Sequence, residues 1–567
     1  MGTKMRIDNG LNDMMQVVSF FEQKKSEDPL FYYSFKTDPA KNVMHIFWAD
    51  GTGIRNYPQY GDFLSFDTTY KTNKYNLNFA PFVGVNGHGD NCLFACGFIQ
   101  DEKKETFEWL YQTFPKCMGG KVPKSVITDQ NAAMKKAVPK CFPNCTHMNC
   151  LFHILTKAQN KARRTFSRNQ HLNAQFHDVI LNSQTVEEFE QLWPQMIEEH
   201  KVQHIKYFGI MWKNRKRFVP AFFKNDFFPF MQSTARSEGT NAVFKANVGL
   251  SHSVIAFMTE FDRISQSIEE KRKENDSVTR RTSPTMWSDW ALEKQAAKLY
   301  NRGIFYKFQQ ELMNSTKFHM MEVEKNKQYE VYKSPTQALL DYNPRTFTVI
   351  VDRESESIAC ACGKFEKDGI LCCHALKVIQ ALNVDELPEK FFIDRWRPKE
   401  KRVFQGNEQD ANLEDLDEQM AFFLFSRRLV QLASEASKNL ARRKMLNEQI
   451  ENLEKLILDI PCMPEMEQSK CSASDITAIT GEIMTSDSKG EKKLNDPVYI
   501  KPKGRIKKTW RQKSIVEEII SKPKVTCSGC QKQGHNITGC KQIEEKSPQK
   551  PTKTGARSNH CSCNEEE

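Results

Sequence analysis

The sequence has no long uninterrupted apolar segment. No run approaches the roughly 18–20 apolar residues that span a bilayer, and the opening residues MGTKMRIDNGLNDMM lack the apolar core of a secretory signal. These absences argue against a membrane-spanning or secreted class and predict an intracellular protein with reduced thiols. The 17 Cys residues then need an explanation other than disulfides, and metal binding is the first candidate.

The chain also has little excess of charge of one sign. The 82 Lys and Arg residues face 71 Asp and Glu residues, which leaves a formal net charge of +11. This excess suits an anionic partner such as nucleic acid, but it fits simple solubility equally well. The length of 567 residues predicts several domains, and the 39 Phe residues are ample for a packed core.

Residues 1–60 are predicted to be a short lead-in. The segment GLNDMMQVVSFFEQKKSEDP has apolar residues at helical spacing and closes at Pro29, which predicts a helix. LFYYSFKTD and VMHIFWAD predict a hairpin.

Residues 61–260 are predicted to form an α/β domain. Three apolar runs, GDFLSFDTTY, NLNFAPFVGVN and NCLFACGFIQD, predict an antiparallel meander. A helix over EKKETFEWLYQTFPKCMG, a short buried strand at KSVITDQ and further strand–helix units follow. This order is that of a ribonuclease-H-like fold, interrupted by a basic helical insertion over residues 165–232 that is rich in Trp and Phe.

The remainder of the chain is predicted to alternate between helical, metal-binding and disordered segments, with no internal repeat. The predicted segments are a helical connector at 261–345, a zinc finger at 346–385, a helix at 420–460, a disordered basic linker at 461–526 and a zinc knuckle at 527–540. The 420–460 helix carries apolar residues at 4-3-4 spacing, namely Leu446, Ile450, Leu453 and Ile457. A short coiled-coil seam and an ordinary packed helix explain that spacing equally well.

The segment CACGKFEKDGILCCHALKVI has the pattern of a structural zinc site. Its candidate ligands are Cys360, Cys362, Cys372 and His374. Two pairs of soft or borderline ligands across a short loop can complete the tetrahedron that zinc requires. The second pair should lie at the start of a helix after Gly369, and Cys373 is predicted not to be a ligand. Buried Cys beside a satisfied His is the less favoured reading.

A second zinc pattern, CSGCQKQGHNITGC, lies near the C-terminus. Cys527, Cys530, His535 and Cys540 have the spacing Cys-x2-Cys-x4-His-x4-Cys of a zinc knuckle. So short a segment folds only when metal closes it. Knuckles often bind single-stranded nucleic acid, but this one lacks an obvious stacking aromatic residue, so a structural or protein-binding role remains open.

Three acidic residues form a candidate catalytic set. Asp67 ends one predicted strand, Asp129 ends another, and Glu238 lies at a predicted helix start. In a ribonuclease-H-like sheet the two strand ends are neighbours. Three clustered carboxylates bind two divalent cations that promote phosphodiester cleavage. Any one of these acids alone would be read as a surface charge or a cap.

Cys150 and His153 have helical i, i+3 spacing in CTHMNCLFHI. They could pair, bind metal or pack, and packing is the favoured interpretation.

The segment KPKGRIKKTWRQK is a dense basic patch. Its charged residues are Lys501, Lys503, Arg505, Lys507, Lys508, Arg511 and Lys513. It is typical of a nuclear-import or nucleic-acid-binding segment, and a solvated linker is the less favoured alternative.

Four segments over residues 10–400 together resemble a known family. They are GDFLSFDTTYKTNKYNLNFAPFVGVNGHGDNCLF, VITDQNAAMKKAVPKCFPN, RSEGTN and CACGKFEKDGILCCHALKVI, in this order. They resemble the plant far-red-impaired-response family, transcription factors derived from Mutator-like transposases. That family has an N-terminal zinc-chelating DNA-binding domain, a transposase domain and a SWIM zinc finger of form Cys-x-Cys…Cys-x-His.

The resemblance has consequences for fold, site and function. It implies a transposase core followed by a SWIM finger. With the residue patterns above, the predicted fold is an α/β ribonuclease-H-like transposase core with a helical insertion, then a SWIM finger, a helical segment and the knuckle. The resemblance maps Asp67, Asp129 and Glu238 onto the transposase acidic triad, and the first Cys/His set onto the SWIM ligands. It implies nuclear location, transcriptional control linked to phytochrome A, and homo- or heterodimers. The expected cofactors are Zn²⁺ at two structural sites, with Mg²⁺ or Mn²⁺ only if the triad is active.

The sequence departs from this family at its start. It begins just before the transposase domain, and residues 1–60 contain no Cys. We therefore expect either a truncated sequence or a naturally short member that reaches DNA directly or through a partner. The favoured hypothesis is a non-enzymatic nuclear regulator of transcription. The alternatives are an active metal-dependent transposase and a dimerisation partner that lacks DNA binding.

Overall fold

The computed structural model describes residues 12–402 except 71 and 340, single positions at 429, 432 and 436, and the segments 439–458, 478–480 and 494–499. The chain divides into two units, Met1–Pro502 and Lys503–Glu567, and all described residues belong to the first. No helix in these described segments is long and apolar enough to cross a membrane.

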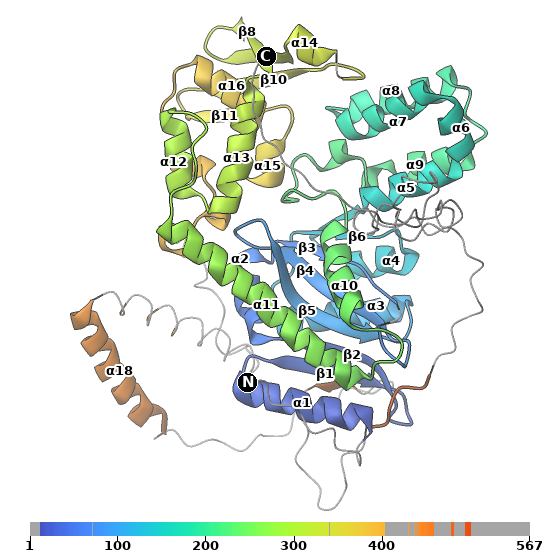
Figure 1. Cartoon of the computed structure of the whole chain (residues 1–567), viewed down its shortest axis with the longest axis vertical. Coiled ribbons are helices and arrows are strands. Elements are labelled where there is room, and N and C mark those ends of the chain that lie inside the picture. The colour runs from blue at the N-terminus through green and yellow to red at the C-terminus, as the bar shows by residue number, and fades with distance from the viewer. Residues whose placement is uncertain are drawn as a thin grey trace, which may run out of the picture. The chain divides into compact units, whose positions relative to one another are not determined.

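The central element is one mixed sheet (Figure 1). Its strands are β1 (Tyr32–Thr37), β2 (Val43–Ala49), β3 (Phe63–Phe66), β4 (Asn78–Val85), β5 (Asn91–Ile99), β6 (Ser125–Thr128), β7 (Thr146–Asn149) and β12 (Ala478–Thr480). Their order is β12-β1-β2-β5-β4-β3-β6-β7. β3, β4 and β5 pair antiparallel, whereas β6 runs parallel to β3 and β7 parallel to β6. The predicted meander and the predicted buried strand after it are therefore confirmed.

Helices cover both faces of this sheet. One face carries α1 (Asp13–Glu27), α10 (Ala235–Asn247) and α11 (Val254–Arg281), and the other carries α2 (Gly51–Tyr60), α3 (Lys104–Cys117) and α4 (Ala132–Cys141). Phe79 contacts Phe244 of α10 at a centroid distance of 4.7 Å, while Phe82 of the same strand stacks on Phe114 of α3 at 4.4 Å. All eight β4 residues are buried, because helices cover this strand on both faces, and its sequence is accordingly almost entirely apolar.

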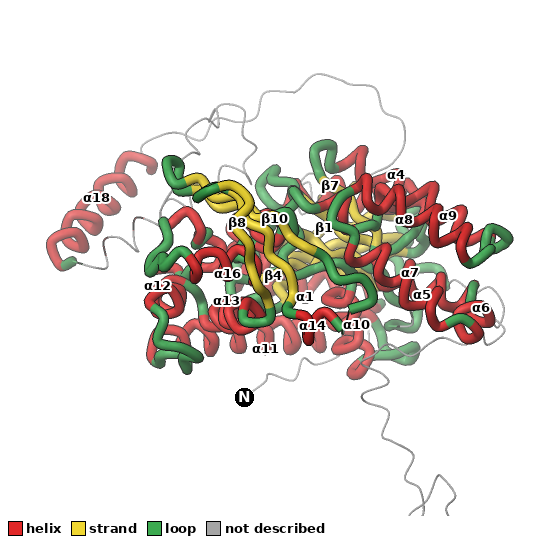
Figure 2. Tube along the Cα trace, turned by 90° about the horizontal axis from the view of Figure 1, so that it is seen from above, coloured by secondary structure: helices red, strands yellow, loops and turns green. Residues whose placement is uncertain are grey.

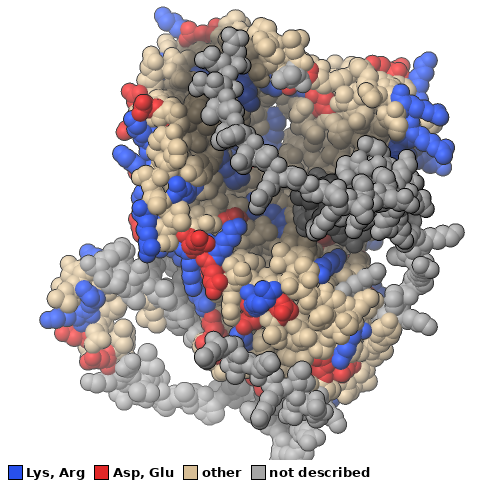
Figure 3. Space-filling model, viewed as in Figure 1, with Lys and Arg blue, Asp and Glu red and all other residues tan. Residues whose placement is uncertain are grey.

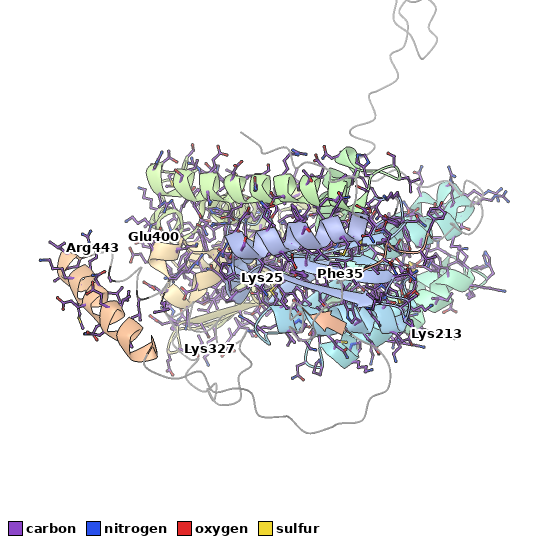
Figure 4. The ribbon with its side chains drawn as sticks, turned by 90° about the horizontal axis from the view of Figure 1, so that it is seen from below. Lys25, Phe35, Lys213, Lys327, Glu400 and Arg443 are labelled. Atoms are coloured by element: carbon purple, nitrogen blue, oxygen red, sulfur yellow. The ribbon has the colours of Figure 1, made fainter. Side chains whose placement is uncertain are left out.

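The described part of the predicted lead-in, residues 12–60, does not form a separate segment, which corrects the predicted boundary. The predicted helix and hairpin are present as α1, β1 and β2, but β2 pairs with β5 and so extends the main sheet. Phe35 of β1 packs on Phe21 of α1 at 5.9 Å, and α1 lies beside α11 on this face (Figure 4). An open edge at β5 would leave backbone groups unpaired, and the hairpin satisfies them.

Two short segments inside the predicted disordered linker are ordered against the sheet. β12 pairs antiparallel with β1. Asp496 accepts hydrogen bonds from the backbone of Met14 and from the hydroxyl of Tyr75, both at 2.9 Å. Backbone pairing at a sheet edge does not need an apolar repeat in the incoming segment, so sequence periodicity gave no sign of it.

The helical insertion predicted over residues 165–232 is confirmed, but the helical region begins earlier, at Leu151. It comprises α5 (Leu151–Lys161), α6 (Arg163–Arg168), α7 (Gln170–Asn182), α8 (Val186–Glu199), α9 (Lys206–Asn214), and the short 3-10 helices η1 (Arg215–Arg217) and η2 (Pro220–Phe223). These helices group together (Figure 2) around a core of their own. The ring centroids of Phe176, Trp193 and Phe208 lie within 6.0 Å of one another in this core.

A smaller sheet follows the long helix α11. Its strands are β8 (Phe318–Glu324), β9 (Gln328–Lys333), β10 (Thr346–Asp352) and β11 (Ser357–Cys360). The helices of this part of the chain are α12 (Ala291–Leu299), α13 (Arg302–Ser315), α14 (Pro335–Ala338), α15 (Lys364–Asp368) and α16 (Cys373–Ala381). The strand order is β11-β10-β9-β8, all antiparallel. The prediction of a helical connector over 261–345 is thus wrong at β8 and β9. In β9, Tyr329 and Val331 are buried, whereas Glu330 between them is less buried. This alternation is that of a strand.

Three short 3-10 helices and one longer helix follow the smaller sheet along the chain. After α16 come the 3-10 helices η3 (Glu389–Phe391), η4 (Asp394–Trp396) and η5 (Lys399–Lys401), and then α18 (Leu440–Leu458). α18 lies within the predicted 420–460 helix. Ile450 is 38% and Leu453 48% exposed, so these two positions of the predicted seam are not packed within the described part of the chain.

Candidate functional site

The first candidate site is the Cys/His set of the smaller sheet. Cys360 ends β11, Cys372 is the N-cap of α16, and His374 lies in the first turn of that helix. The ligand atoms of Cys360, Cys362, Cys372 and His374 all lie within 4.8 Å of one another, with Cys360 Sγ 3.7 Å from His374 Nδ1. Neighbouring ligands around tetrahedral zinc are about 3.5 Å apart. The set therefore fits a zinc ion, and Cys373 is not part of it.

Two glycines shape the loop between the ligand pairs. Gly363 and Gly369 flank α15 with φ values of 63° and 72°, a left-handed conformation that favours glycine. A Cβ at Gly369 would lie 2.4 Å from Ile393 Cδ1. Trp396 Nε1 donates to the carbonyl of Asp368 at 2.9 Å. The loop is thus held by contacts from the chain beyond α16, which ligand spacing alone does not reveal.

The ligands are oriented by neighbours from other strands. The His374 ring stacks on Phe347 of β10 at 3.7 Å and meets Phe318 of β8 edge-on at 4.7 Å. Hydrogen bonds from the Cys360 and Cys372 thiols lower the pKa of Cys362. The same hydrogen bonds raise the pKa of Cys360 and Cys372, so among the three thiols the first proton leaves Cys362, and zinc binding requires the other two to lose theirs as well.

The second candidate site lies at one edge of the main sheet. Asp67 directly follows β3 and Asp129 directly follows β6, and these strands are parallel neighbours. Glu238 lies in the first turn of α10. Burial, with repulsion from Asp129 and then Glu238, raises the pKa of Asp67 to about 7, while His153 opposes the shift. Crowded carboxylates fit a hard divalent cation such as Mg²⁺ or Mn²⁺, which would polarise a phosphate and activate water there.

Glu238 has contacts that the sequence did not predict. Its carboxylate accepts a hydrogen bond from Thr234 Oγ1 at 3.0 Å and lies 3.5 Å from His153 Nε2. The ligand atoms of Cys150, His153 and Glu238 all lie within 4.8 Å of one another, whereas the two aspartates and Glu238 form no such group among the described residues. Cys150 is buried in the core, but the packing interpretation is wrong for His153, which faces Glu238.

A fourth carboxyl group at this edge escaped sequence analysis. Glu102 follows β5 and accepts hydrogen bonds from Thr68 Oγ1 at 2.5 Å and Asn131 Nδ2 at 3.3 Å. Its charge contributes to raising the pKa of Asp129, for which burial is the larger cause. Glu102 lies in a run of charged loop residues, and nothing in that run distinguishes it.

Two predicted sites lie outside the described residues. They are the knuckle ligands Cys527, Cys530, His535 and Cys540, and the basic segment at 501–513.

Comparison with known proteins places the Cys/His set and the two aspartates Asp67 and Asp129 in recognised domains, whereas Glu238 lies outside the matched residues. Residues 63–157 match the MULE transposase domain and residues 347–383 match the SWIM zinc finger. Among curated Arabidopsis thaliana proteins, Protein FAR1-RELATED SEQUENCE 5 is 30% identical over 387 residues, which are 68% of this chain and 48% of that protein. Protein FAR-RED IMPAIRED RESPONSE 1 is 29% identical over 384 residues, which are 68% of this chain and 46% of that protein. Protein FAR1-RELATED SEQUENCE 9 is 28% identical, with 69% and 71% covered. The chain spans about half the length of the first two relatives.

Proposed function

We propose, since the chain belongs to the FAR1 family of transposase-derived plant factors, that it is a zinc-binding regulator of transcription. It would act in the nucleus, in far-red (phytochrome A) light signalling, and use its transposase core as a binding scaffold rather than an enzyme. One observation carries this proposal, namely that the zinc finger and the acid-bearing sheet share one core.

The shared core joins residues that lie far apart in sequence. Phe63, Val85 and Ile127 of the main sheet pack in one cluster with Leu376 and other residues of α16. Arg395, after the finger, forms an ion pair with Asp62 beside β3, with an N–O distance of 2.9 Å. Loss of zinc from the finger would therefore also disturb the main sheet. This is what we expect of a scaffold whose folding depends on its metal.

The sheet order supports a ribonuclease-H-like core. β5, β4 and β3 run antiparallel, and β6 and β7 extend the sheet parallel to β3. Acids at the ends of β3 and β6 then occupy the edge where that fold class carries its metals. This argument rests on analogy of fold.

DNA would be bound through exposed basic side chains of the helical insertion. Lys161, Arg163, Arg164 and Arg168 are exposed at the end of α5 and in α6. Figure 3 shows Lys and Arg gathered over this group of helices. Such side chains bind phosphates without reading sequence. The basic segment 501–513 and the proposed knuckle would add contacts, and α18, with Ile450 and Leu453 exposed, would serve pairing with a second copy or a relative.

An active metal-dependent transposase is the second candidate. The crowding of carboxylates that raises the pKa of Asp67 favours it, because cation-binding sites collect such charges. The regulator is preferred because Glu238 is engaged by Thr234 and His153.

Parallel DNA-binding and DNA-nicking assays on the zinc-loaded full chain test the proposal. We expect binding that weakens with salt, and no nicking with Mg²⁺ or Mn²⁺. A plot of the logarithm of the DNA-binding constant against the logarithm of salt concentration has a negative slope, to which each phosphate contact contributes about 0.9. The double variant Arg163→Gln/Arg164→Gln should make this slope less steep by about 1.8. The matched control Lys325→Gln/Lys327→Gln removes the same charge from the β8–β9 turn and should leave the slope unchanged. Nicking that Asp129→Asn abolishes would favour the transposase.

A further inference from the structure

Cys150, His153 and Glu238 are brought together at two helix starts. Cys150 is the N-cap of α5, His153 lies in the first turn of α5, and Glu238 lies in the first turn of α10. The backbone amide of Leu151 donates to the carbonyl of Gln232 at 3.0 Å, which holds the two helix starts side by side. One sulfur, one ring nitrogen and one carboxylate oxygen therefore converge from rigid elements rather than from loops.

Thr234 orients two of these three groups. Its amide donates to Cys150 Sγ at 3.3 Å, and its hydroxyl donates to Glu238 Oε1 at 3.0 Å. Thr234 is fully buried, so both bonds are shielded from water. Metal ligands are usually held by such hydrogen bonds from a second layer of residues.

The histidine ring lies between the other two groups, in contact with Cys150 and with Glu238. His153 Nδ1 is buried and has no hydrogen-bond partner among the described residues, while Nε2 lies 3.5 Å from Glu238 Oε1. A cation between the three groups would be bound through Nε2, the ring nitrogen that faces Glu238. By contrast, a second candidate trio, His171, Glu199 and His200, has both His200 nitrogens occupied by amides.

The donor set selects the class of metal. Sulfur, imidazole and carboxylate suit Zn²⁺, whereas Mg²⁺ and Ca²⁺ require oxygen donors. The His153 and Glu238 side chains are 38% and 23% exposed, so solvent reaches the group. Three protein ligands with an accessible fourth position are typical of an open zinc site rather than a closed structural one.

We propose that Cys150, His153 and Glu238 form an open site for a thiophilic divalent cation such as Zn²⁺, separate from the SWIM zinc. Glu238 is then shared between this site and the carboxylates at the sheet edge. Zn²⁺ bound here withdraws Glu238 from Asp67 and Asp129 and places positive charge beside them. The two kinds of metal therefore compete, and zinc keeps the transposase-type edge from assembling a Mg²⁺ pair. This site does not depend on DNA binding or on transcriptional action.

Cobalt binding tests the site directly. The full chain is dialysed against a weak chelator that spares tightly held zinc, and is then titrated with Co²⁺ while sulfur-to-cobalt charge-transfer absorption is recorded. We expect the unmodified protein to bind one more Co²⁺ per chain than Cys150→Ser or His153→Asn. Cys145→Ser is the matched control, because Cys145 lies outside the group and its substitution should leave the stoichiometry and spectrum unchanged.

Two further variants make the outcome decisive. Glu238→Gln should weaken Co²⁺ binding at least tenfold while keeping the charge-transfer band at saturation. His153 is partly exposed, so His153→Asn tests the site even if Cys150→Ser fails to fold. Equal stoichiometry and spectra for His153→Asn and the unmodified protein would overturn the proposal, whatever the DNA-binding result.

Discussion

Replacing Asp67 with Asn should stabilise the protein at neutral pH. Burial and repulsion from Asp129 and Glu238 raise the pKa of Asp67 from 3.8 to about 7. In the unfolded chain this carboxyl group ionises near its ordinary pKa. At neutral pH its raised pKa in the folded state therefore lowers the free energy of unfolding. One pKa unit corresponds to about 1.4 kcal/mol, so ionised Asp67 costs at most about 4 kcal/mol of folding free energy.

The sign of this effect depends on pH. Below pH 3.8 Asp67 is protonated in the folded and in the unfolded protein, and it does not lower the stability. The loss of folding free energy grows between pH 3.8 and about 7 and is constant above that range. Asn has nearly the shape of the protonated carboxyl and carries no charge. Asp67→Asn should therefore raise the free energy of unfolding by about 2–4 kcal/mol near pH 7.5 and change it little near pH 4.

Urea unfolding without divalent cations at these two pH values measures the effect, provided the denaturant slope is unchanged. Asp101→Asn is the matched control. Burial opposes ionisation there, but hydrogen bonds from Lys103 and Thr106 lower the pKa of Asp101, so its loss should destabilise the protein. Mg²⁺ should raise the midpoint of the unmodified protein more than that of Asp67→Asn. A variant no more stable than the unmodified protein near pH 7.5 would refute the reasoning.

Three further predictions concern zinc, pH and a buried ion pair. Cys372→Ser should release the SWIM zinc and lower reporter transcription, whereas Cys373→Ser should retain the metal by elemental analysis; equal zinc content in both would contradict the assignment of Cys372 as a ligand. Burial lowers the pKa of His45 to about 4, so stability should fall by about 3 kcal/mol as pH drops from 6.5 towards 4, and His45→Gln should reduce that dependence in urea melts. Arg345 donates two hydrogen bonds of 2.9 and 3.0 Å to Asp178, and its side chain is 8% exposed. Arg345→Ala should lower the free energy of unfolding in urea melts by about 3–5 kcal/mol. A loss below about 1 kcal/mol would show that the pair is dispensable.

Local spacing was enough to predict which residues of the smaller sheet come together as a candidate zinc site. The pairs Cys360 with Cys362 and Cys372 with His374 are each one residue apart, and a strand end followed by a helix start brings them together. Asp67 and Asp129 were identified for a similar reason, since each directly follows an apolar run. The first case depends on a short segment alone, whereas the two aspartates come together only through the parallel pairing of β3 with β6.

Packing between distant segments decided the rest. His153 meets Glu238 only because α5 and α10 start side by side, and Glu102 joins the acids only because β5 ends near them. β2 extends the main sheet and Asp496 caps α1 for the same kind of reason. The sequence by itself determined which residues could bind metal within a short segment. Only the tertiary structure decided which carboxylate, thiol and imidazole share a site, because contacts across 80 or more residues depend on strand register and helix packing, which residue spacing does not encode.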